Sequence, residues 1–259
     1  MSETPDLIYT TDGPVARITI NREPQKNALS PSAIALFHDA LTQAQEDTDV
    51  RTVIVTGSGE KAFCTGADLG SAIKTDGSAL PVAESYATLL HRLTTFPKPT
   101  VAMVKGYCLA GGMGLMLACD MVLADDGSRY GTPEVNVGLF PMMIGALIFR
   151  NVPRKKAMEM ILTGRMLTSQ EALAMGLVTS LHPMESLEDE VDKLTAILSE
   201  KSPIGLRLGK EAFAIAEELP FEKAVLALAE ALTRVIDTKD AAEGISAFKE
   251  KRKPRFTGT

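Results

Sequence analysis

The segment from Pro99 to Asp120 constrains the fold of this 259-residue chain more than any other part. It begins with the apolar, β-type run Pro99–Val104, passes through four glycines within nine residues, and becomes an apolar stretch that ends at Cys119. A strand that leads through a glycine turn into a buried helix leaves the first N–H groups of that helix unpaired. Such groups favour developing negative charge on a ligand. Between Lys105 and Asp120 there is no carboxylate, His or Ser.

The composition limits the class of protein. With 45% hydrophobic residues the chain can bury a sizeable core, and its net charge of −6 argues against a nucleic-acid or anionic-membrane partner. The three cysteines are odd in number and lie in apolar surroundings, which is typical of reduced thiols in a cytosolic protein. No secretory signal and no apolar run of ~20 residues is visible. We therefore expect a soluble, cytoplasmic protein.

Hydrophobic periodicity predicts alternating strands and helices in the first half of the chain. Residues 57–79 are rich in glycine and poorly periodic, so we expect a loop there. The expected strands are 7–10, 15–20, 52–56, 100–104 and 121–124. One expected helix begins at Ser30-Pro31, and a second spans residues 80–95.

From Met142 onward the pattern is nearly all helical. The predicted fold class is therefore α/β, with a core over residues 1–195 and a helical region over 196–259. The later helices carry more apolar surface than a short tail can bury, so we expect some of them to cover another subunit. The expected helices are 154–162, 169–175, 187–198, 204–217, 222–236 and 238–253.

Three familiar kinds of site are not supported by the residue patterns. Gly57–Ala62 fits the dinucleotide fingerprint G-x-G-x-x-A, but no helix pattern follows to hold a pyrophosphate. The three histidines, His38, His91 and His182, are far apart, and no metal-ligand spacing exists, so we expect no metal. None of these histidines lies in a loop that could activate a Ser or Cys nucleophile.

Two glycine turns are the strongest indication of a site. One is Phe63–Leu69 and the other is Leu109–Gly114. Each could direct a backbone N–H toward a common point, because glycine permits close approach of the main chain to a ligand. Two such donors would form an oxyanion hole. Both segments could equally be simple tight turns.

Glu134 is the one acid in the stretch 130–139, which is otherwise apolar, glycine or uncharged. A carboxyl group among apolar neighbours has its charged form disfavoured, which raises its pKa toward the range of a useful base. A glutamate in the first helical turn after Pro133 is also physically ordinary. The pattern alone leaves both interpretations open.

Several phrases together resemble the enoyl-CoA hydratase/isomerase (crotonase) family, in its order and over nearly the whole chain. The resemblance implies a spiral of ββα units, a helical C-terminal trimerisation region, a homotrimer or a dimer of trimers, and an acyl-CoA thioester substrate without a further cofactor. The phrases are AFCTGADL (62–69), VKGYCLAGGMGLMLACD (104–120), YGTPEVNVGL (130–139), LTGRMLTSQEALAMGLV (162–178) and EGISAFKEKRKPRF (243–256).

The same resemblance implies roles for individual residues. The oxyanion hole would be the backbone N–H groups of Ala67 and Gly111, and Glu134 would be a catalytic acid–base group. The resemblance implies that the basic C-terminal stretch approaches the adenine and phosphates, from the same or a neighbouring subunit. The residues alone are equally consistent with a solvated basic tail. The residues implied to bind coenzyme A are Lys26, Ala28, Lys61, Ala62, Phe63, Asp68, Leu69, Phe248 and Lys251. Those implied to line the acyl pocket are Met113, Pro133, Leu139, Phe140, Met142 and Met143.

The sequence departs from the family pattern at Gly114. Typical hydratases carry a glutamate there in addition to the one that Glu134 matches, whereas isomerases of the family keep only the second. Hydration uses two carboxylates, while moving a double bond needs one base that removes a proton at C2 and returns it at C4. We therefore expect Δ3–Δ2 enoyl-CoA isomerisation. The alternatives are 2-enoyl-CoA hydration and an acyl-CoA-binding protein with negligible turnover.

Overall fold

The chain begins with a β-hairpin. The computed structural model describes residues 5–68 and 79–259. Strands β1 (Leu7–Asp12) and β2 (Val15–Ile20) pair antiparallel, and Gly13 supplies the left-handed φ of +52° at the turn. Glycine adopts this conformation without a steric penalty. The two expected strands are confirmed, and the first runs two residues further than expected, to Asp12.

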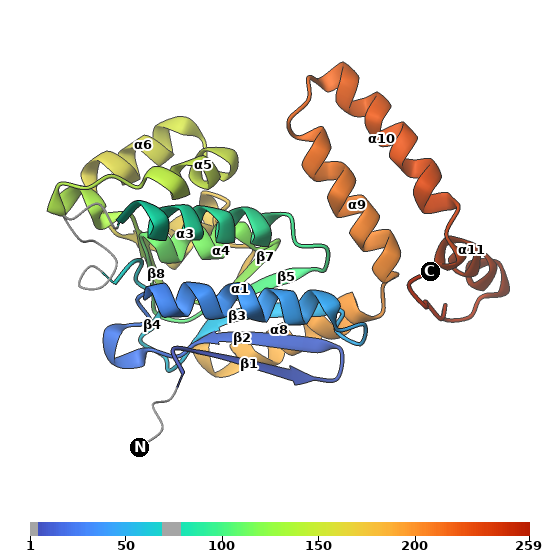
Figure 1. Cartoon of the computed structure of the whole chain (residues 1–259), viewed down its shortest axis with the longest axis horizontal. Helices are drawn as coiled ribbons and strands as arrows, with labels where there is room; N and C mark the ends of the chain where they lie inside the picture. The colour runs from blue at the N-terminus through green and yellow to red at the C-terminus, as the bar shows by residue number, and fades with distance from the viewer. Residues whose placement is uncertain (1–4, 69–78) are drawn as a thin grey trace.

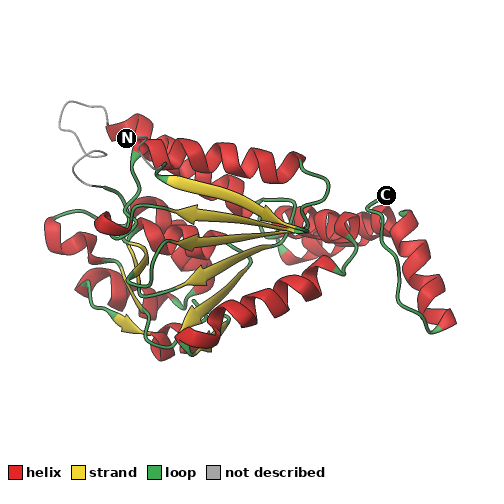
Figure 2. Cartoon of the chain, turned by 90° about the horizontal axis from the view of Figure 1, so that it is seen from below, coloured by secondary structure: helices red, strands yellow, loops and turns green. Residues whose placement is uncertain are grey.

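The main sheet has six strands, in the order β1-β2-β3-β5-β7-β10. All neighbours after the hairpin run parallel. Its further strands are β3 (Thr52–Gly57), β5 (Thr100–Val104), β7 (Met121–Asp125) and β10 (Ser180–His182). Every residue of β3 and β5 is buried, as expected for β-branched runs in a sheet that helices cover on both faces (Figure 2).

A second sheet of four short strands, in the order β4-β6-β8-β9, contains the strand ends that matter for the site. The strands are β4 (Ala62–Cys64), β6 (Tyr107–Leu109), β8 (Arg129–Gly131) and β9 (Leu167–Thr168). The loop expected over 57–79 is wrong for Ala62–Cys64, which form β4, and residues 69–78 of that segment lie outside the described part of the chain. Strands of two or three residues between glycines are too short to give a period.

Helices surround the two sheets (Figure 1). Helix α1 (Pro31–Glu46) starts as expected, because the Ser30 side chain accepts a hydrogen bond from the Ala33 N–H. The other helices of this part are α3 (Ala79–Thr94), α4 (Gly111–Ala118), α5 (Met142–Asn151), α6 (Arg154–Thr163), α7 (Ser169–Ala174) and α8 (Met184–Ser199). In α4, every residue after Gly111 is buried.

The last three helices form an arm that extends from the core (Figure 1). They are α9 (Pro203–Ala216), α10 (Phe221–Ile236) and α11 (Lys239–Glu250), and α9 packs along α10. The boundary expected at residue 195 falls inside α8, which packs on β3, β5 and β7. The expectation of a nearly all-helical second half overlooked the short strands β9 and β10. No helix within the described part of the chain is both long and apolar enough to cross a membrane.

Candidate functional site

Three parallel strands of the second sheet end side by side, and the candidate residues follow them. Cys64 of β4 pairs with Cys108 of β6, and Leu109 of β6 pairs with Gly131 of β8. The carboxyl ends of parallel strands meet at one edge of a sheet, where open α/β sheets bind their ligands. This register brings together three segments that are far apart in sequence: Thr65–Ala67, Ala110–Gly111 and Thr132–Glu134.

The turn after β4 and the start of α4 are in van der Waals contact. Gly66 has a φ of +98°, and a Cβ at this position would lie 2.7 Å from the Ala110 Cβ and 3.0 Å from the Gly111 nitrogen. Only glycine allows the two backbones to approach this closely. Two hydrogen bonds with Leu29 fix the turn: its N–H donates to the Gly66 carbonyl (2.7 Å), and its carbonyl accepts from the Asp68 N–H (2.9 Å).

Helix α4 begins without a side-chain cap, because Ala110 at its N-cap has a φ of +48° and no hydroxyl or carboxylate. The Ala110 N–H donates to the Gly131 carbonyl (2.9 Å), which ties α4 to the end of β8. Among the hydrogen bonds of the described residues, none is donated by the N–H of Ala67 or of Gly111. Two unpaired backbone donors on adjoining turns can stabilise an oxyanion.

Glu134 lies in the 3₁₀ helix η2 (Pro133–Val137), three residues after the end of β8. Its side chain is half-buried, and its Oε2 is buried without a hydrogen-bond partner. Burial raises the pKa of the Glu134 carboxyl, and the hydrogen bond from its own backbone N–H partly opposes that shift. A partly desolvated carboxylate with a free oxygen is suited to accept a proton.

Tyr86 of α3 reaches the same place, although no motif or spacing in the sequence indicates it. Its hydroxyl donates a hydrogen bond to the Gly111 carbonyl. Burial raises the pKa of Tyr86 well above its usual value, and the Cys64 and Cys108 thiols and the Glu134 charge add to the effect. A tyrosine in an amphipathic helix is usually part of the core, and only the packing of α3 on α4 identifies this one.

Gly114, the position without an acid, is tightly enclosed. A Cβ there would approach the Tyr86 hydroxyl and the Ile144 Cγ2 to well under 3.0 Å, and the Leu90 Cδ2 to 3.3 Å. These three side chains come from α3 and α5. Gly114 is therefore a packing requirement of the fold as well as a missing carboxylate.

Some residues expected to bind coenzyme A lie beside the turn after β4. Lys26 has a left-handed φ of +52°, its carbonyl accepts from the Thr65 hydroxyl (3.2 Å), and its ammonium lies 5.7 Å from the Tyr107 ring centroid. The Ala28 carbonyl accepts a hydrogen bond from Arg22, which also pairs with Asp68 at 2.9 Å. Leu69 lies outside the described residues.

The remaining expected coenzyme A residues are divided between two regions. Lys61 is exposed, whereas the side chains of Ala62 and Phe63 are buried in the core, so that only their backbone can face a ligand. Phe248 is 84% exposed and Lys251 is exposed at the end of α11. Within one chain the arm holds α11 far from β8 (Figure 1), so the structure does not bring these two residues to the site.

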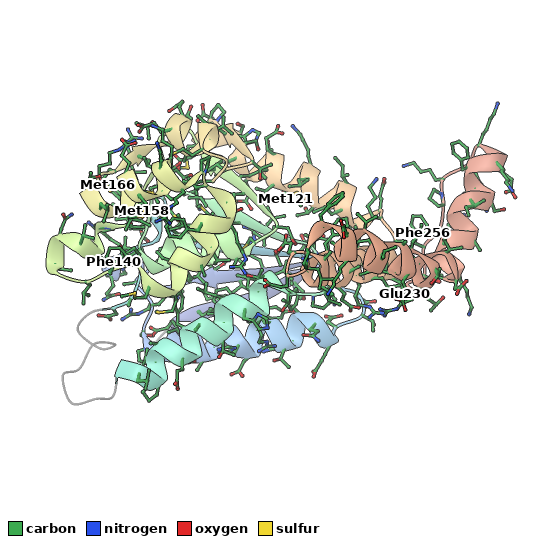
Figure 3. All side chains as sticks on the ribbon, turned by 90° about the horizontal axis from the view of Figure 1, so that it is seen from above. Met121, Phe140, Met158, Met166, Glu230 and Phe256 are labelled. Atoms are coloured by element: carbon green, nitrogen blue, oxygen red, sulfur yellow. The ribbon has the colours of Figure 1, made fainter. Side chains whose placement is uncertain are left out.

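The residues expected to line an acyl pocket follow Glu134, except Met113, which is fully buried within α4. Pro133 is half-buried, and the exposed fraction is 42% for Leu139, 45% for Phe140, 38% for Met143 and 72% for Met142. Phe140 lies at the opposite end of the molecule from Glu230 of the arm (Figure 3). These four exposed apolar side chains follow the candidate base closely in the chain.

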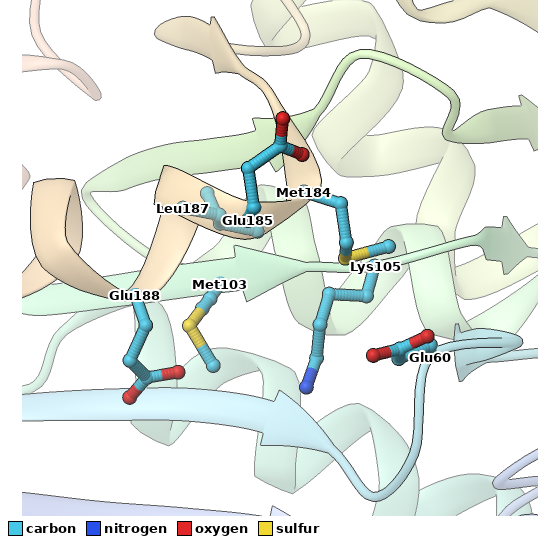
Figure 4. Close-up of a pocket in the computed structure, with 7 residues that line it drawn as sticks. All are labelled: Glu60, Met103, Lys105, Met184, Glu185, Leu187 and Glu188. Carbon is cyan, nitrogen blue, oxygen red and sulfur yellow. The ribbon is translucent and has the colours of Figure 1, made fainter.

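Other groups among the described residues are weaker candidates for a catalytic site. A cavity of about 340 Å³ between the ends of β3 and β5 and the start of α8 is lined by Glu60, Lys105 and Glu188, among others (Figure 4). Its residues lie on other elements than the turns described above. Burial raises the pKa of the Cys64 thiol to about 12, which keeps it protonated and a poor nucleophile. Among the described residues, no three His, Cys, Asp or Glu side chains are placed to hold a metal ion.

Comparison with known proteins identifies the family. The family model described as enoyl-CoA hydratase/isomerase matches residues 10–259. The chain belongs to this family. It is 37% identical to a Thermus thermophilus protein assigned by name to the enoyl-CoA hydratases, over 96% of this chain and 100% of that one. It is 32% identical to the 2,3-dehydroadipyl-CoA hydratase of Escherichia coli, over 98% and 99% of the two chains.

A solved structure gives the same result for the fold. The enoyl-CoA hydratase from Bacillus anthracis superposes with a TM-score of 0.94 at 33% identity, and covers 98% of this chain and 100% of that one. The protein is thus an enzyme of the crotonase fold, and its family implies an acyl-CoA thioester substrate.

Proposed function

We propose that this enzyme catalyses Δ3–Δ2 enoyl-CoA isomerisation with Glu134 as its one base. The proposal rests on one observation about acids at the site. Glu134 has a buried Oε2 without a hydrogen-bond partner, and position 114 is a glycine that supplies no second carboxylate. Among the described residues, Glu134 is the acid whose charge acts on the Tyr86 hydroxyl at this place.

The proposed reaction needs one proton acceptor. The thioester carbonyl oxygen of a 3-enoyl-CoA accepts hydrogen bonds from the N–H groups of Ala67 and Gly111. Glu134 removes a proton from C2, the C2 electrons form a dienolate, and its charge rests on the carbonyl oxygen. Protonated Glu134 then returns the proton at C4, and the double bond comes to lie between C2 and C3. No water is consumed and the base is regenerated.

The geometry supports each part of this reaction separately. The two backbone N–H groups have no partner among the described residues, and Gly66 permits their turns to touch. The raised pKa of Glu134 makes it a stronger proton acceptor than an exposed glutamate. Removing one oxyanion-hole donor typically costs ~10²–10³ in rate, so two donors and one base supply a large part of the catalysis.

Hydration of a 2-enoyl-CoA is the second candidate, because the relatives compared above are named hydratases. Glu134 alone would then have to activate the water and also deliver the proton to C2. The two reactions share the oxyanion hole and differ in whether water is held beside C3.

We also propose that the enzyme assembles through its arm, as a trimer or a dimer of trimers. Large apolar side chains are exposed on it: Phe213 of α9 (64%), Phe221 and Leu226 of α10 (81% and 72%) and Phe248 of α11 (84%). Burial of apolar surface stabilises association by about 25 cal/mol per Å². A neighbouring arm would also place Phe248 and Lys251 nearer a bound coenzyme A. Light scattering after gel filtration tests the assembly, and a monomer would contradict it.

Parallel assays of 3-enoyl-CoA and 2-enoyl-CoA test the reaction. The conjugated thioester absorbs in the near ultraviolet, so isomerisation creates this signal and hydration removes it. We expect rapid appearance of the signal from the 3-enoyl substrate. Rapid loss of the signal from the 2-enoyl substrate alone would support hydration. If the signal changes with neither substrate, the protein binds acyl-CoA without turnover.

A further inference from the structure

The Tyr86 hydroxyl occupies the place that an acidic side chain at position 114 would need. A Cβ at Gly114 would lie well under 3.0 Å from this hydroxyl, and a Cβ at Gly111 would lie 3.3 Å from it. Tyr86 is only 6% exposed, and it belongs to α3 rather than to α4. A neighbouring helix thus supplies the polar group that the glycine helix lacks.

The chemical state of this hydroxyl differs from that of a carboxylate. Its proton is donated to the Gly111 carbonyl, in the first turn of α4. Burial raises the pKa of Tyr86 far above neutrality, so the group stays protonated and cannot remove a proton from water. A carboxylate at the same place would be an acceptor.

The surrounding side chains leave little room for a water molecule beside Gly114. The other nearest atoms to a Cβ at Gly114 are Ile144 Cγ2 of α5 and Leu90 Cδ2 of α3, and both belong to buried apolar residues. A stable buried water needs space and two to four polar partners. Hydration requires such a water next to the base, whereas isomerisation requires none.

We propose that Tyr86 is a positioning residue that replaces the second acid: it holds the first turn of α4 and keeps water out of the space beside Gly114. The site then lacks the water that hydration of a 2-enoyl thioester consumes, whereas isomerisation of a 3-enoyl thioester proceeds without it. The proposal rests on the function proposed above. It assigns the choice of reaction to a residue of α3, in addition to the missing glutamate of α4.

The test compares isomerisation of 3-enoyl-CoA with hydration of 2-enoyl-CoA in the wild type and two variants. Tyr86→Phe keeps the ring and removes the hydroxyl. Tyr86→Ala opens the space beside Gly114. Leu93→Ala is the matched control, because Leu93 is fully buried in the same helix, about two turns further along. If Tyr86→Ala does not fold, Tyr86→Leu removes the same end of the side chain and keeps an apolar helix former.

Tyr86→Phe should keep the wild-type ratio of the two rates and lower kcat for isomerisation about tenfold, with little change in KM, because one hydrogen bond that holds α4 is lost. The acidic limb of its pH profile should not move, since Glu134 owes its raised pKa to its own burial. In Tyr86→Ala the ratio of the hydration rate to the isomerisation rate should rise about tenfold or more. General acid–base catalysis contributes roughly 10²–10⁴-fold to a rate, so a water admitted beside the base would gain part of that factor. Leu93→Ala should keep the wild-type ratio.

The outcomes separate this proposal from the one on which it rests. A wild type that does not isomerise 3-enoyl-CoA contradicts the proposed function. A wild type that isomerises, with Tyr86→Ala or Tyr86→Leu keeping its ratio within twofold, overturns the role of Tyr86 alone. An equal rise in Leu93→Ala would also overturn it, because general loosening of α3 would then explain the change.

Discussion

Replacement of Gly114 by alanine tests the packing on which the one-base site depends. In an open helix this change is stabilising by about 1 kcal/mol, because alanine loses less backbone entropy than glycine. Here the new methyl group would meet the Tyr86 hydroxyl and the Ile144 Cγ2 at well under 3.0 Å. Overpacking of this kind costs about 1–3 kcal/mol. The penalty therefore equals or exceeds the helical gain.

Gly145→Ala is the matched control, because Gly145 lies inside α5 and a Cβ there would meet nothing within 4 Å. This control should gain about 0.4–1 kcal/mol. Gly114→Ala should thus be less stable than Gly145→Ala by about 1–3 kcal/mol, or ~2–10 °C in melting temperature for a chain of this size. Scanning calorimetry, with urea unfolding as a second measure, provides the assay.

A Tyr86→Phe background identifies the source of the penalty. Removing the hydroxyl eliminates one of the two closest contacts, so Gly114→Ala should cost about 1 kcal/mol less in that background than in the wild type. The reasoning is refuted if Gly114→Ala is as stable as Gly145→Ala, or if the Tyr86→Phe background leaves the penalty unchanged.

Four further outcomes follow from the site. Glu134→Gln should lower the isomerisation rate by about 10²–10⁴ and leave the affinity for coenzyme A near normal. The control Glu185→Gln, in the separate cavity, should be fully active. An active Glu134→Gln enzyme would exclude Glu134 as the base. The rate should fall as pH decreases through the raised pKa of Glu134, at a higher pH than for an exposed glutamate, and a profile that is flat until below the ordinary carboxyl range would contradict this. The charged form of Glu134 opposes folding, so Glu134→Gln should melt higher than the wild type at neutral pH, with the gain lost below the ordinary carboxyl pKa. Gly66→Ala should cost about 1–3 kcal/mol of stability and most activity, because alanine resists a φ of +98° and its methyl would strike Ala110; normal kinetics would separate this turn from the site.

The sequence predicted the long elements well for a physical reason. Buried β-branched runs such as Thr52–Thr56 and the Ser30-Pro31 helix start carry local signals that tertiary contacts do not override. The short strands β4, β6 and β8 were not predicted, because three residues give no period and their pairing is set by neighbours far along the chain.

The candidate site residues also differ in whether local sequence or contacts between distant segments indicate them. Glycine turns and an isolated glutamate can be recognised from local sequence, so the turn Leu109–Gly114 and Glu134 could be named as candidates from it. Tyr86 was not, since its importance arises from the contact of α3 with α4 and leaves no trace in the spacing of apolar residues. The distance of Phe248 from the site in one chain likewise depends on the course of the arm.

The parallel ends of β4, β6 and β8 have a consequence for how such an enzyme can change. The proposed oxyanion donors follow β4 and β6, while the proposed base follows β8 on a connection of its own. Substitutions after β8 can therefore change the proposed base and leave the proposed hydrogen bonds to the thioester carbonyl in place. In a lineage of such enzymes the proposed base and the proposed thioester contacts can change independently, because they lie on separate connections of the sheet.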